Sequence, residues 1–392
     1  MDHQSVLRRP PDVDPLALTP SGEGEELRAV VRDFLHDTSP PEVVRELVES
    51  RHGYDPAAWK RMAAELGVHG LAVPEAYGGA GYTFAELAVV LEEAGRALLC
   101  APLFSTVVLA ANALLESGDE AACARYLPPI VAGELVATIG LPAAPGGELG
   151  GQPGGCTAQR RGGGWVVGGT LGFLVDGDTA DLVLVLARGP DGPTLFACER
   201  GSSGFASEPM RVLDGTRRQA RLRLRDAPAT PVGVPGDGER IVAGVVDLAL
   251  TALAAEQLGG SAYALDSSVG YVSERRQFGR PIGSFQAIKH RLADLLVEVE
   301  AARSASGYAT WAAASGTPEL PLAASAAKAV CSDAFTRASA ELVQMHGGMG
   351  FTWEHPAHLY VRRARSSEVF LGTPALHRRR VAQLVGVSVS PH

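Results

Sequence analysis

The period of the hydrophobic pattern changes twice along this chain of 392 residues. The order of the three resulting regions constrains the fold more than any single motif. From about residue 24 to residue 133, apolar residues recur every three or four positions, as in "ELRAVVRDFLHD", which is typical of amphipathic helices. Short β-type runs follow, including "ADLVLVLAR" and the alternating "ARLRLRD". Helical periodicity then returns from residue 241 to about residue 385. We therefore predict an α+β protein with helical, β and helical regions in that order.

Proline- and glycine-rich stretches indicate where these regions begin and end. The pattern predicts a flexible tail over 1–20, an N-terminal helical domain over 21–135, a middle β domain over 136–237 and a C-terminal helical domain over 238–386. The stretch "GLPAAPGGELGGQPGGCTAQRRGGG", near the start of the β domain, is too rich in glycine for regular structure. In the last domain, helices are expected to break at Gly279, around "SGTPELP" and at "HGGMG".

The composition argues against several classes of protein. Hydrophobic residues make up 46% of the chain and charged residues 20%, which is typical of a globular protein with a sizeable core. A net charge of −9 argues against binding to nucleic acid, because a polyanion needs a basic face. The five cysteines show no CxxC spacing, so we predict neither a disulfide framework nor a metal site, and a reducing cytoplasm fits.

The longest apolar run, "IVAGVVDLALTALAAEQLGG", contains Asp247 and Glu256. Two carboxylates in its middle are unfavourable in lipid, so the run predicts a buried helix and not a membrane span. The N-terminal stretch lacks an apolar core of signal-peptide length, and we expect a soluble, cytoplasmic protein.

Three arginines surround a Phe-Gly pair in "SERRQFGRPIGSFQAIKHRLADLL", between two apolar helical segments. The helix before this stretch carries an apolar stripe, which predicts that it faces the core. Arg275 and Arg276 fall at its expected C-terminal end, where the helix dipole favours cations, and Gly279 is expected to break the helix. Taken alone, a charged helix terminus explains the stretch about as well as an anion-binding site does.

The stretch also resembles the flavin-binding signature of the acyl-CoA dehydrogenase family, R-x-x-F-G-x-x-I-x-x-F-Q-x-I, here residues 275–288 (the first signature). About seventy residues later, "QMHGGMGFTWEHPAHLYVRRAR" resembles the same family's Q-x-x-G-G-x-G-[FY] signature, here residues 344–351 (the second signature). The resemblance extends over nearly the whole chain from about residue 24. It implies an N-terminal helical domain, a middle β-barrel-like domain and a C-terminal four-helix bundle.

The resemblance also implies FAD binding and α,β-dehydrogenation of an acyl thioester. Arg275, Gln277 and Phe278 would contact the pyrophosphate of FAD, for which guanidinium geometry is well suited. In this family these contacts are donated across a dimer interface to the flavin of the neighbouring subunit, and glycines let backbone N–H groups come close to it. The remaining cofactor contacts implied by position are Ile282, Gln344, Gly347, Gly348, Thr373 and Phe173.

The other half of the expected flavin site, in the β domain, departs from the family pattern. The family's A-x-T-E-P-x-A-G-S-D-like loop reads "TIGLPAAPGGELGG", and its W-I-[ST] strand reads "GFLVDG". Phe173 stands in place of the tryptophan. Val175 replaces a hydroxyl residue that would reach flavin N5, and valine cannot form that hydrogen bond. This half of the site is therefore predicted to be degraded.

The glutamate base that would remove the α-proton is missing from both of its family positions. Leu371 takes its place in the Y-E-G-T motif, which reads "VFLGT", and Ala249 takes its place on the helix after the β domain. Glu256, seven residues after Ala249, lies on the same helical face but about 10 Å along it. Glu256, Asp247 and Glu368 could in principle substitute, although a structural or solvated carboxylate is the more common interpretation of each.

A narrower resemblance is to actinobacterial acyl-CoA dehydrogenases without the usual base, in which "TWEH…HLY" and "LDxTRR" recur. Some of these form heterotetramers with a base-carrying subunit. The leading hypothesis is therefore a base-less subunit of a heteromeric, FAD-dependent enzyme, a dimer or tetramer with an acyl-CoA substrate and an electron-transfer acceptor. A second is a homo-oligomeric acyl-CoA or acyl-carrier-protein dehydrogenase of a biosynthetic pathway with a displaced base. A third is a flavin-free scaffold or non-redox enzyme on the same fold.

Overall fold

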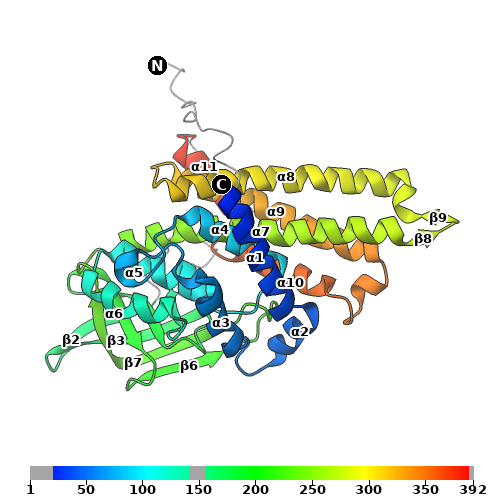
Figure 1. Cartoon of the computed structure of the whole chain (residues 1–392). Coiled ribbons are helices and arrows are strands. Elements are labelled where there is room, and N and C mark those ends of the chain that lie inside the picture. Colours follow the sequence, from blue (N-terminus) through cyan, green and yellow to red (C-terminus); the bar gives the residue numbers. More distant parts are fainter. Residues whose placement is uncertain (1–20, 142–154, 388–392) are drawn as a thin grey trace, which may run out of the picture. The chain divides into compact units, whose positions relative to one another are not determined.

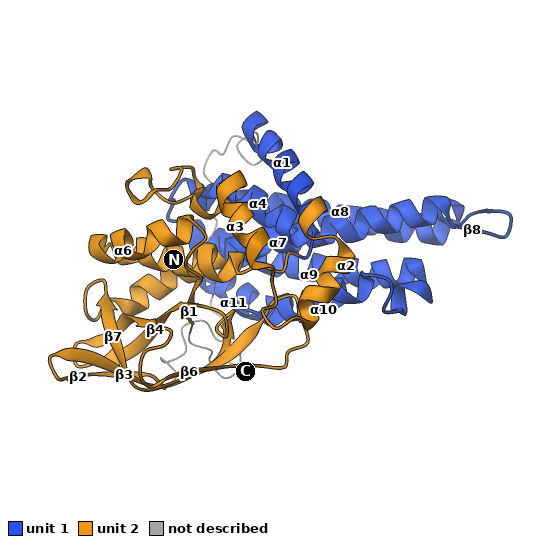
Figure 2. Cartoon of the chain, turned by 60° about the horizontal axis from the view of Figure 1, so that its bottom comes forward, with its two compact units in different colours: residues 1–36, 84–98, 250–392 blue, residues 37–83, 99–249 orange. Residues whose placement is uncertain are grey.

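Figure 1 shows the computed structural model of the chain, which describes residues 21–141 and 155–387. The chain divides into two compact units, coloured separately in Figure 2. Unit 1 takes residues 1–36, 84–98 and 250–392, and unit 2 takes the segments between them. The expected N-terminal tail and residues 142–154 of the glycine-rich stretch lie outside the described residues. The expectation that this stretch forms no regular structure is wrong for its last part, because Thr157–Arg161 forms strand β2.

Unit 1 is built from long helices, and α7 enters it from unit 2. Its elements are α1 (Gly22–Thr38), α4 (Phe84–Arg96), α7 (Gly238–Glu274), β8 (Arg276–Gln277), β9 (Arg280–Pro281), η6 (Ile282–Ser284), α8 (Gln286–Ala314), α9 (Leu320–His346), η7 (Met349–Phe351), α10 (Ala357–Val369) and α11 (Pro374–Leu384). The breaks expected near Gly279, "SGTPELP" and "HGGMG" are confirmed, because α7, α8 and α9 each end shortly before or within these sequences.

Helix α7 is a core helix, as its sequence predicted. By length and composition it could cross a membrane, but 78% of its most apolar 18-residue window is buried inside the protein. Of its apolar stripe, Leu250, Leu253 and Leu258 are buried, whereas Val269 near the end of the helix is 43% exposed. Its apolar character is therefore accounted for by packing against the rest of the chain.

Helices α4 and α7 approach each other to backbone contact. A Cβ atom on Gly95 of α4 would lie 1.9 Å from the carbonyl oxygen of Glu256, and one on Gly259 of α7 would lie 1.8 Å from that of Glu92. Real Cβ atoms essentially never come within 3.0 Å of such atoms. The crossing therefore requires a residue without a side chain on both helices.

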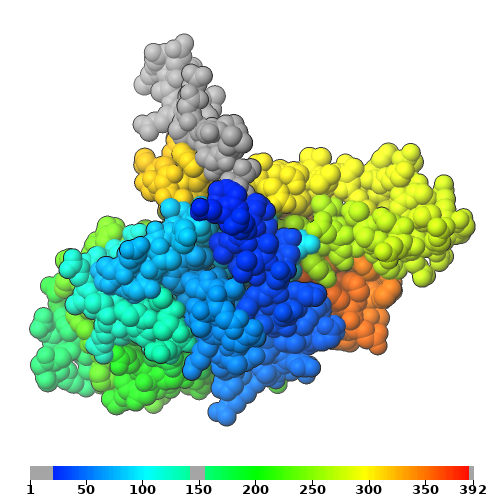
Figure 3. Space-filling model, in the orientation of Figure 1, coloured from blue at the N-terminus to red at the C-terminus, as the bar shows by residue number. Residues whose placement is uncertain are grey.

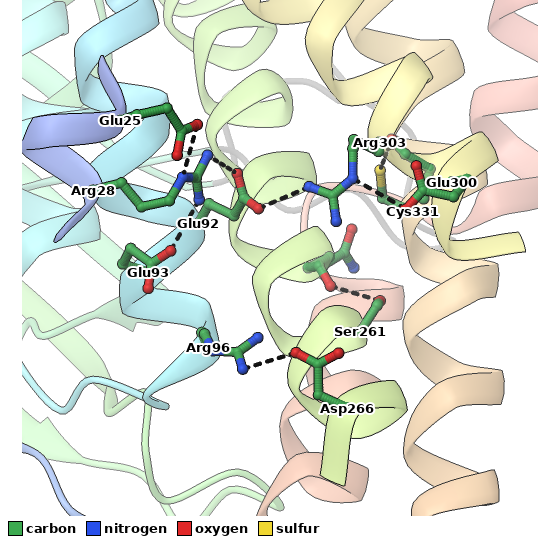
Figure 4. A network of polar contacts seen from close by, with 12 residues as sticks. Glu25, Arg28, Glu92, Glu93, Arg96, Ser261, Asp266, Glu300, Arg303 and Cys331 are labelled. Carbon is green, nitrogen blue, oxygen red and sulfur yellow. Dashed lines mark hydrogen bonds and ion pairs between the residues drawn. The ribbon is translucent and has the colours of Figure 1, made fainter. Parts of the chain in front are cut away.

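An ion-pair network lies beside this crossing and lines a cavity of about 570 Å³ (Figure 4). The carboxylate of Glu93 on α4 accepts hydrogen bonds from Arg28 at 2.9 Å and from Arg32 at 2.7 and 2.9 Å, both on α1. Glu92 accepts from Arg28 at 2.9 Å and from Arg303 of α8 at 3.2 Å. Two adjacent carboxylates of α4 thus hold both α1 and α8.

The environment of Glu93 favours its charged form. Its side chain is only 2% exposed, and burial acts to raise the pKa of the carboxyl. Hydrogen bonds from Arg32 and Arg28 outweigh burial, so the pKa of Glu93 is lowered from its ordinary value. Charge on Glu93 therefore stabilises the folded state.

Unit 2 combines short helices with a seven-stranded sheet of order β1-β4-β2-β3-β7-β5, in which β6 pairs with β7. Because β5 also pairs with β4, strands β4, β2, β3, β7 and β5 close into a ring, which agrees with the barrel-like expectation. The strands are β1 (Ala137–Gly140), β2 (Thr157–Arg161), β3 (Gly164–Val175), β4 (Leu182–Gly189), β5 (Gly192–Glu199), β6 (Phe205–Pro209) and β7 (Gln219–Val232).

The core of unit 2 lies between the sheet and the helices. Strand β4 is buried over six consecutive residues, as its unbroken apolar run predicts, and β7 alternates between buried and exposed residues. The helices are α2 (Pro41–Glu49), α3 (Pro56–Leu66), η3 (Val68–Gly70), η4 (Glu75–Tyr77), the buried π-helix η5 (Phe104–Ala111), α5 (Asn112–Ser117) and α6 (Glu120–Val131). The change from helix to strand falls between α6 and β1, and the boundary at residue 135 stays a prediction.

We expect Glu93→Gln to lower the free energy of unfolding by about 3 kcal/mol at neutral pH, because it leaves two guanidinium groups beside a neutral amide in a buried site. Denaturant titration measures the change. The control is Glu300→Gln, which removes a partly exposed carboxylate 3.3 Å from Arg303 and should cost at most about 1 kcal/mol. Equal losses in the two variants would contradict a special role for Glu93.

The Glu93 contribution should also depend on pH with a definite sign. Because the folded-state pKa lies below the unfolded one, the stabilisation is fully present above the unfolded pKa and is lost as pH falls through the folded pKa. The stability difference between wild type and Glu93→Gln should therefore shrink on acidification. A difference that stays constant from neutral to strongly acidic pH would show that the charge of Glu93 is not its source.

Candidate functional site

The first signature forms a tight hairpin between α7 and α8 (Figure 1). Strands β8 and β9 pair, and Phe278 and Gly279 form the turn between them with φ of 53° and 78°. Positive φ at both turn positions is the geometry of a type I′ turn, in which glycine is strongly preferred. The side chain of Phe278 is 91% exposed. The hairpin thus presents an aromatic ring to the exterior of the chain.

Arg275 lies between the end of α7 and this hairpin. Its N–H donates to the carbonyl of Tyr271 at 2.8 Å, and its own carbonyl accepts from the N–H of Ile282 at 2.8 Å. The side chains of Arg275 and Gln277 are exposed, and no side chain in the described part of the chain pairs with either. The backbone of Arg275 is therefore held in place while its guanidinium group stays open to an external anion.

The second signature caps α9. Gly347 follows the helix with φ 58° and ψ −135°, a conformation that is accessible almost only to glycine. A Cβ atom on Gly347 or Gly348 would meet nothing within 4 Å, so the backbone there borders open space. Gln344 is exposed on the last turn of the helix.

Aromatic stacking brings the two signatures together. The ring of Tyr271, one turn before Arg275, stacks on His346 with centroids 4.2 Å apart, and His346 in turn contacts His355 at 4.3 Å. His346 directly precedes Gly347. In Figure 3 the surface of the α7–α8 tip, in yellow-green, lies next to the orange surface around the second signature. Both signatures therefore lie at one end of unit 1.

Exposed aromatic and apolar side chains surround the signatures. We call them the aromatic rim, and its members are Phe278 (91% exposed), Phe351 (86%), Trp353 (69%) and Met349 (48%). Sequence reasoning did not single out the last three, although "MGFTW" in a turn after a helix was a usable signal. A rim of this kind is typical of a surface that another molecule covers.

Leu371 and Thr373 lie in the turn between α10 and α11. Leu371 has φ 58°, a left-handed conformation that costs a leucine about 1–2 kcal/mol, and Gly372 follows with φ 104°. Nε2 of His377 donates to the carbonyl oxygen of Leu371 at 2.9 Å. The hydroxyl of Thr373 accepts from the N–H of Leu376 at 3.3 Å, so within the chain Thr373 acts as the N-cap of α11.

A buried lysine supports the same turn from α9. Lys328 is fully buried, and its Nζ donates to Ser332 Oγ at 2.8 Å and to the carbonyls of Ser367 and Glu368 at 3.0 and 3.1 Å. The two carbonyls belong to the last turn of α10. We call residues 367–373, which are the last residues of α10 and the turn that follows them, the 367–373 loop. Sequence reasoning missed Lys328, and its only signal was a cation within an alanine-rich helix.

Neither of the two expected base positions carries a carboxylate, and of the substitutes that the sequence offered, Asp247 is buried and Glu368 pairs with Arg365 at 3.0 Å. Ala249 is fully buried, and Leu371 carries no ionisable group. Glu256 is engaged by Arg363, whose Nη1 donates to its Oε1 at 2.6 Å, and the two side chains are 8% and 4% exposed. Protonation of a carboxylate in such a pair leaves a buried guanidinium group uncompensated. Glu256 is thus better placed to stabilise unit 1 than to accept a proton.

In unit 2, Phe173 lies in a bulge of β3. The register between β3 and β7 shifts between Leu171 and Leu174, and Phe173 takes φ 55° with its side chain 59% exposed. Bulges of this kind re-aim a side chain. Val175, which ends the strand opposite Gln219, is 3% exposed. The strand therefore offers an aromatic ring at its surface and no hydroxyl at its end.

The residue after this strand is anchored to the π-helix. Asp176 has φ 51°, and its carboxylate accepts a hydrogen bond from Ser105 Oγ at 2.6 Å. Burial raises the pKa of Asp176 to about 6, against the effect of the Ser105 hydrogen bond and of nearby Arg217. These contacts hold the end of β3 against η5.

Comparison with known proteins gives two matches to family models. Residues 21–134 match "Acyl-CoA dehydrogenase, N-terminal domain", and residues 236–386 match "Acyl-CoA dehydrogenase, C-terminal domain". Acyl-CoA dehydrogenase IpdE2 of Mycolicibacterium smegmatis is 36% identical over 361 residues, which cover 92% of this chain and 98% of the relative.

Solved structures agree with these matches. The Tcur3481-Tcur3483 steroid ACAD (acyl-CoA dehydrogenase) is 33% identical with a TM-score of 0.82, and the match covers 94% of this chain and 98% of that one. A chain of the ChsE4-ChsE5 complex from Mycobacterium tuberculosis is 28% identical with a TM-score of 0.85, covering 95% of this chain and 100% of that one. This chain therefore belongs to the acyl-CoA dehydrogenase family of oxidoreductases, which act on CH–CH groups.

Proposed function

We propose that this chain is a subunit of a cytoplasmic, heteromeric, FAD-dependent acyl-CoA dehydrogenase, and that a second acyl-CoA dehydrogenase subunit supplies the catalytic base. One observation carries the proposal. The two signatures in unit 1 present open, unpaired groups, whereas neither Leu371, Ala249 nor Glu256 offers a free carboxylate. A dehydrogenase subunit of this kind needs a partner for its reaction.

The residues of unit 1 fit the anionic part of FAD. The exposed guanidinium group of Arg275 and the amide of Gln277 can donate to phosphate oxygens without breaking a contact within the described chain. The open space beside Gly347 and Gly348 lets a ligand approach the backbone N–H of the capping turn. Ile282 and Phe278 add apolar surface to the same hairpin.

The chain supplies fewer polar groups at the end of FAD where the hydride is accepted. Bound FAD would supply the acceptor for the hydride that leaves the β-carbon. Val175 provides no donor there, while the exposed ring of Phe173 can still pack against a flat ligand. Because Leu371 and Ala249 cannot accept the α-proton and Glu256 is paired with Arg363, the acceptor of that proton on our proposal belongs to the second subunit.

The aromatic rim supports an oligomer, a dimer or tetramer. Phe278 and Phe351 are more than 80% exposed, which is unfavourable in water unless another surface covers them. Two similar solved structures carry names of two components, Tcur3481-Tcur3483 and ChsE4-ChsE5, and the first is named a steroid ACAD. A second acyl-CoA dehydrogenase subunit is therefore the partner that we propose, with a separate electron-transfer acceptor.

Two alternatives make different demands on the chain. A homo-oligomer acting on acyl-CoA or an acyl carrier protein would need its own base, and the ion pair with Arg363 weighs against Glu256 in that role. A flavin-free scaffold or non-redox enzyme is favoured by Val175 alone. This alternative leaves the open groups of the two signatures without a ligand, which weighs against it.

Co-expression with the partner should give a yellow complex with about one FAD per pair of subunits, because each site needs residues of both chains. The chain purified alone should retain little flavin. Absorbance of the released cofactor against protein concentration measures both. Full FAD occupancy of the lone chain would rule out the partner requirement, and a colourless complex would favour the flavin-free alternative.

Arg275→Ala should weaken FAD binding by at least about tenfold, because a charge-assisted hydrogen bond is worth about 1.5–3 kcal/mol. The FAD dissociation constant of the complex, measured by fluorescence quenching, reports the loss. Arg276→Ala is the matched control, since Arg276 is the exposed neighbour that the signature does not specify. An equal effect of the two substitutions would show that Arg275 serves only as a charged residue at the end of α7.

Glu256→Gln separates the two dehydrogenase hypotheses. On our proposal it lowers stability by about 3 kcal/mol but leaves the turnover of the folded complex nearly unchanged. The double substitution Glu256→Gln with Arg363→Met removes the uncompensated cation and should recover part of that stability without changing turnover. If the lone chain dehydrogenates an acyl-CoA and Glu256→Gln abolishes the reaction, the base lies in this chain.

A further inference from the structure

Two buried basic side chains hold the 367–373 loop, and the proposed function uses neither. Lys328 contacts the start of the loop through two carbonyls, and His377 contacts its centre through the carbonyl of Leu371. Both side chains are fully buried. Burying such groups is costly without specific partners, so their placement calls for a reason.

Lys328 caps the C-terminal end of α10. The last carbonyls of a helix have no partner within the helix and form the negative end of its dipole. The ammonium group supplies donors to two of them, and its third contact, Ser332 Oγ, also accepts from Nε2 of Gln257 on α7 at 2.9 Å. The loop is thereby connected through α9 to the core helix α7.

His377 acts as a neutral donor. A carbonyl oxygen only accepts, so the 2.9 Å contact with Leu371 places the proton on Nε2. Burial lowers the pKa of His377 to about 4, which keeps the ring uncharged at neutral pH. The contact joins the first turn of α11 to Leu371, the residue of the loop that combines a left-handed backbone with a large side chain.

We propose that Lys328 and His377 are positioning residues that fix Leu371 in its left-handed conformation, so that its side chain forms part of the wall that meets the acyl group. A leucine adopts φ 58° only where its surroundings impose it, and imposed strain is characteristic of functional sites. Here a hydrogen bond to the strained residue itself and a cap on the preceding helix impose it. The inference rests on the proposed acyl-CoA function.

Calorimetric titration of the purified complex with octanoyl-CoA and with CoA alone tests this role without using turnover. His377→Leu and Lys328→Met should each weaken octanoyl-CoA binding by about tenfold, the equivalent of one hydrogen bond, and leave CoA binding unchanged. His377→Gln should restore binding, because its amide N–H can donate at the same place. His52→Leu and Lys60→Met, at exposed positions, are the matched controls and should change neither affinity.

Leu371→Gly shows whether the effect passes through Leu371. Glycine removes the side chain and adopts a positive φ without strain, so His377→Leu in this background should change octanoyl-CoA binding by less than about twofold. A full tenfold loss in the glycine background, or no loss in the single variants, overturns the positioning role. Thermal unfolding of each variant identifies losses that come from unfolding, and His377→Gln keeps the test valid if Lys328→Met does not fold.

The outcome for the wild-type complex separates the two proposals. If it binds octanoyl-CoA no more tightly than CoA, no wall meets the acyl group, and the positioning role fails while the CoA-dependent function stands. If it binds neither compound, the acyl-CoA function fails and the positioning role with it.

Discussion

The backbone contact between α4 and α7 at Gly95 and Gly259 is the constraint on which unit 1 depends. Because the two helices touch without intervening side chains, Glu92 and Glu93 of α4 lie beside the crossing, within reach of arginines from α1 and α8. The same contact fixes the course of α7, whose last residue immediately precedes Arg275. The position of the first signature therefore follows from a packing contact at Gly259, a little more than four helical turns away.

Local signals in the sequence predicted much of this architecture. The helix end at His346 depends on the neighbouring Gly347, and the hairpin after α7 depends on Gly279; both glycines act through their own backbone. Contacts distant in sequence could not be predicted in this way. Arg32 and Glu93 are separated by 61 residues, and either alone is typical of a solvated helix face. Lys328 is likewise indistinguishable from a surface lysine until the carbonyls of α10 meet it.

The candidate site was predictable to a similar extent. The signatures named Arg275, Gly347 and their neighbours, and these residues lie together at one end of unit 1, although their contacts with FAD stay a prediction. The conformation of Phe173 was not predictable, because a bulge depends on the register between two strands and not on either alone. Glu256 appeared available in the sequence because Arg363, its partner, lies 107 residues later.

Charge within unit 1 distinguishes the structural arginines from Arg275, for which we propose an anion-binding role. The guanidinium groups of Arg28, Arg303 and Arg363 each meet a carboxylate, and each therefore neutralises a charge that the fold has brought inside or close to its surface. Arg275 meets none among the described residues, even though its backbone is fixed at both the N–H and the carbonyl. A cation that is held in place and left uncompensated favours an anion from outside the chain.

At the 367–373 loop the opposite holds for Lys328. Its ammonium group is buried and engaged by carbonyl and hydroxyl oxygens, and the residue that it helps to place, Leu371, is apolar. One end of unit 1 thus leaves a cation open to an external anion, whereas Lys328 and His377 use polar contacts to hold a leucine at a position where the sequence resemblance implies a base. On our proposal such a chain binds the reactants of a dehydrogenation, and the α-proton passes to a base on another subunit.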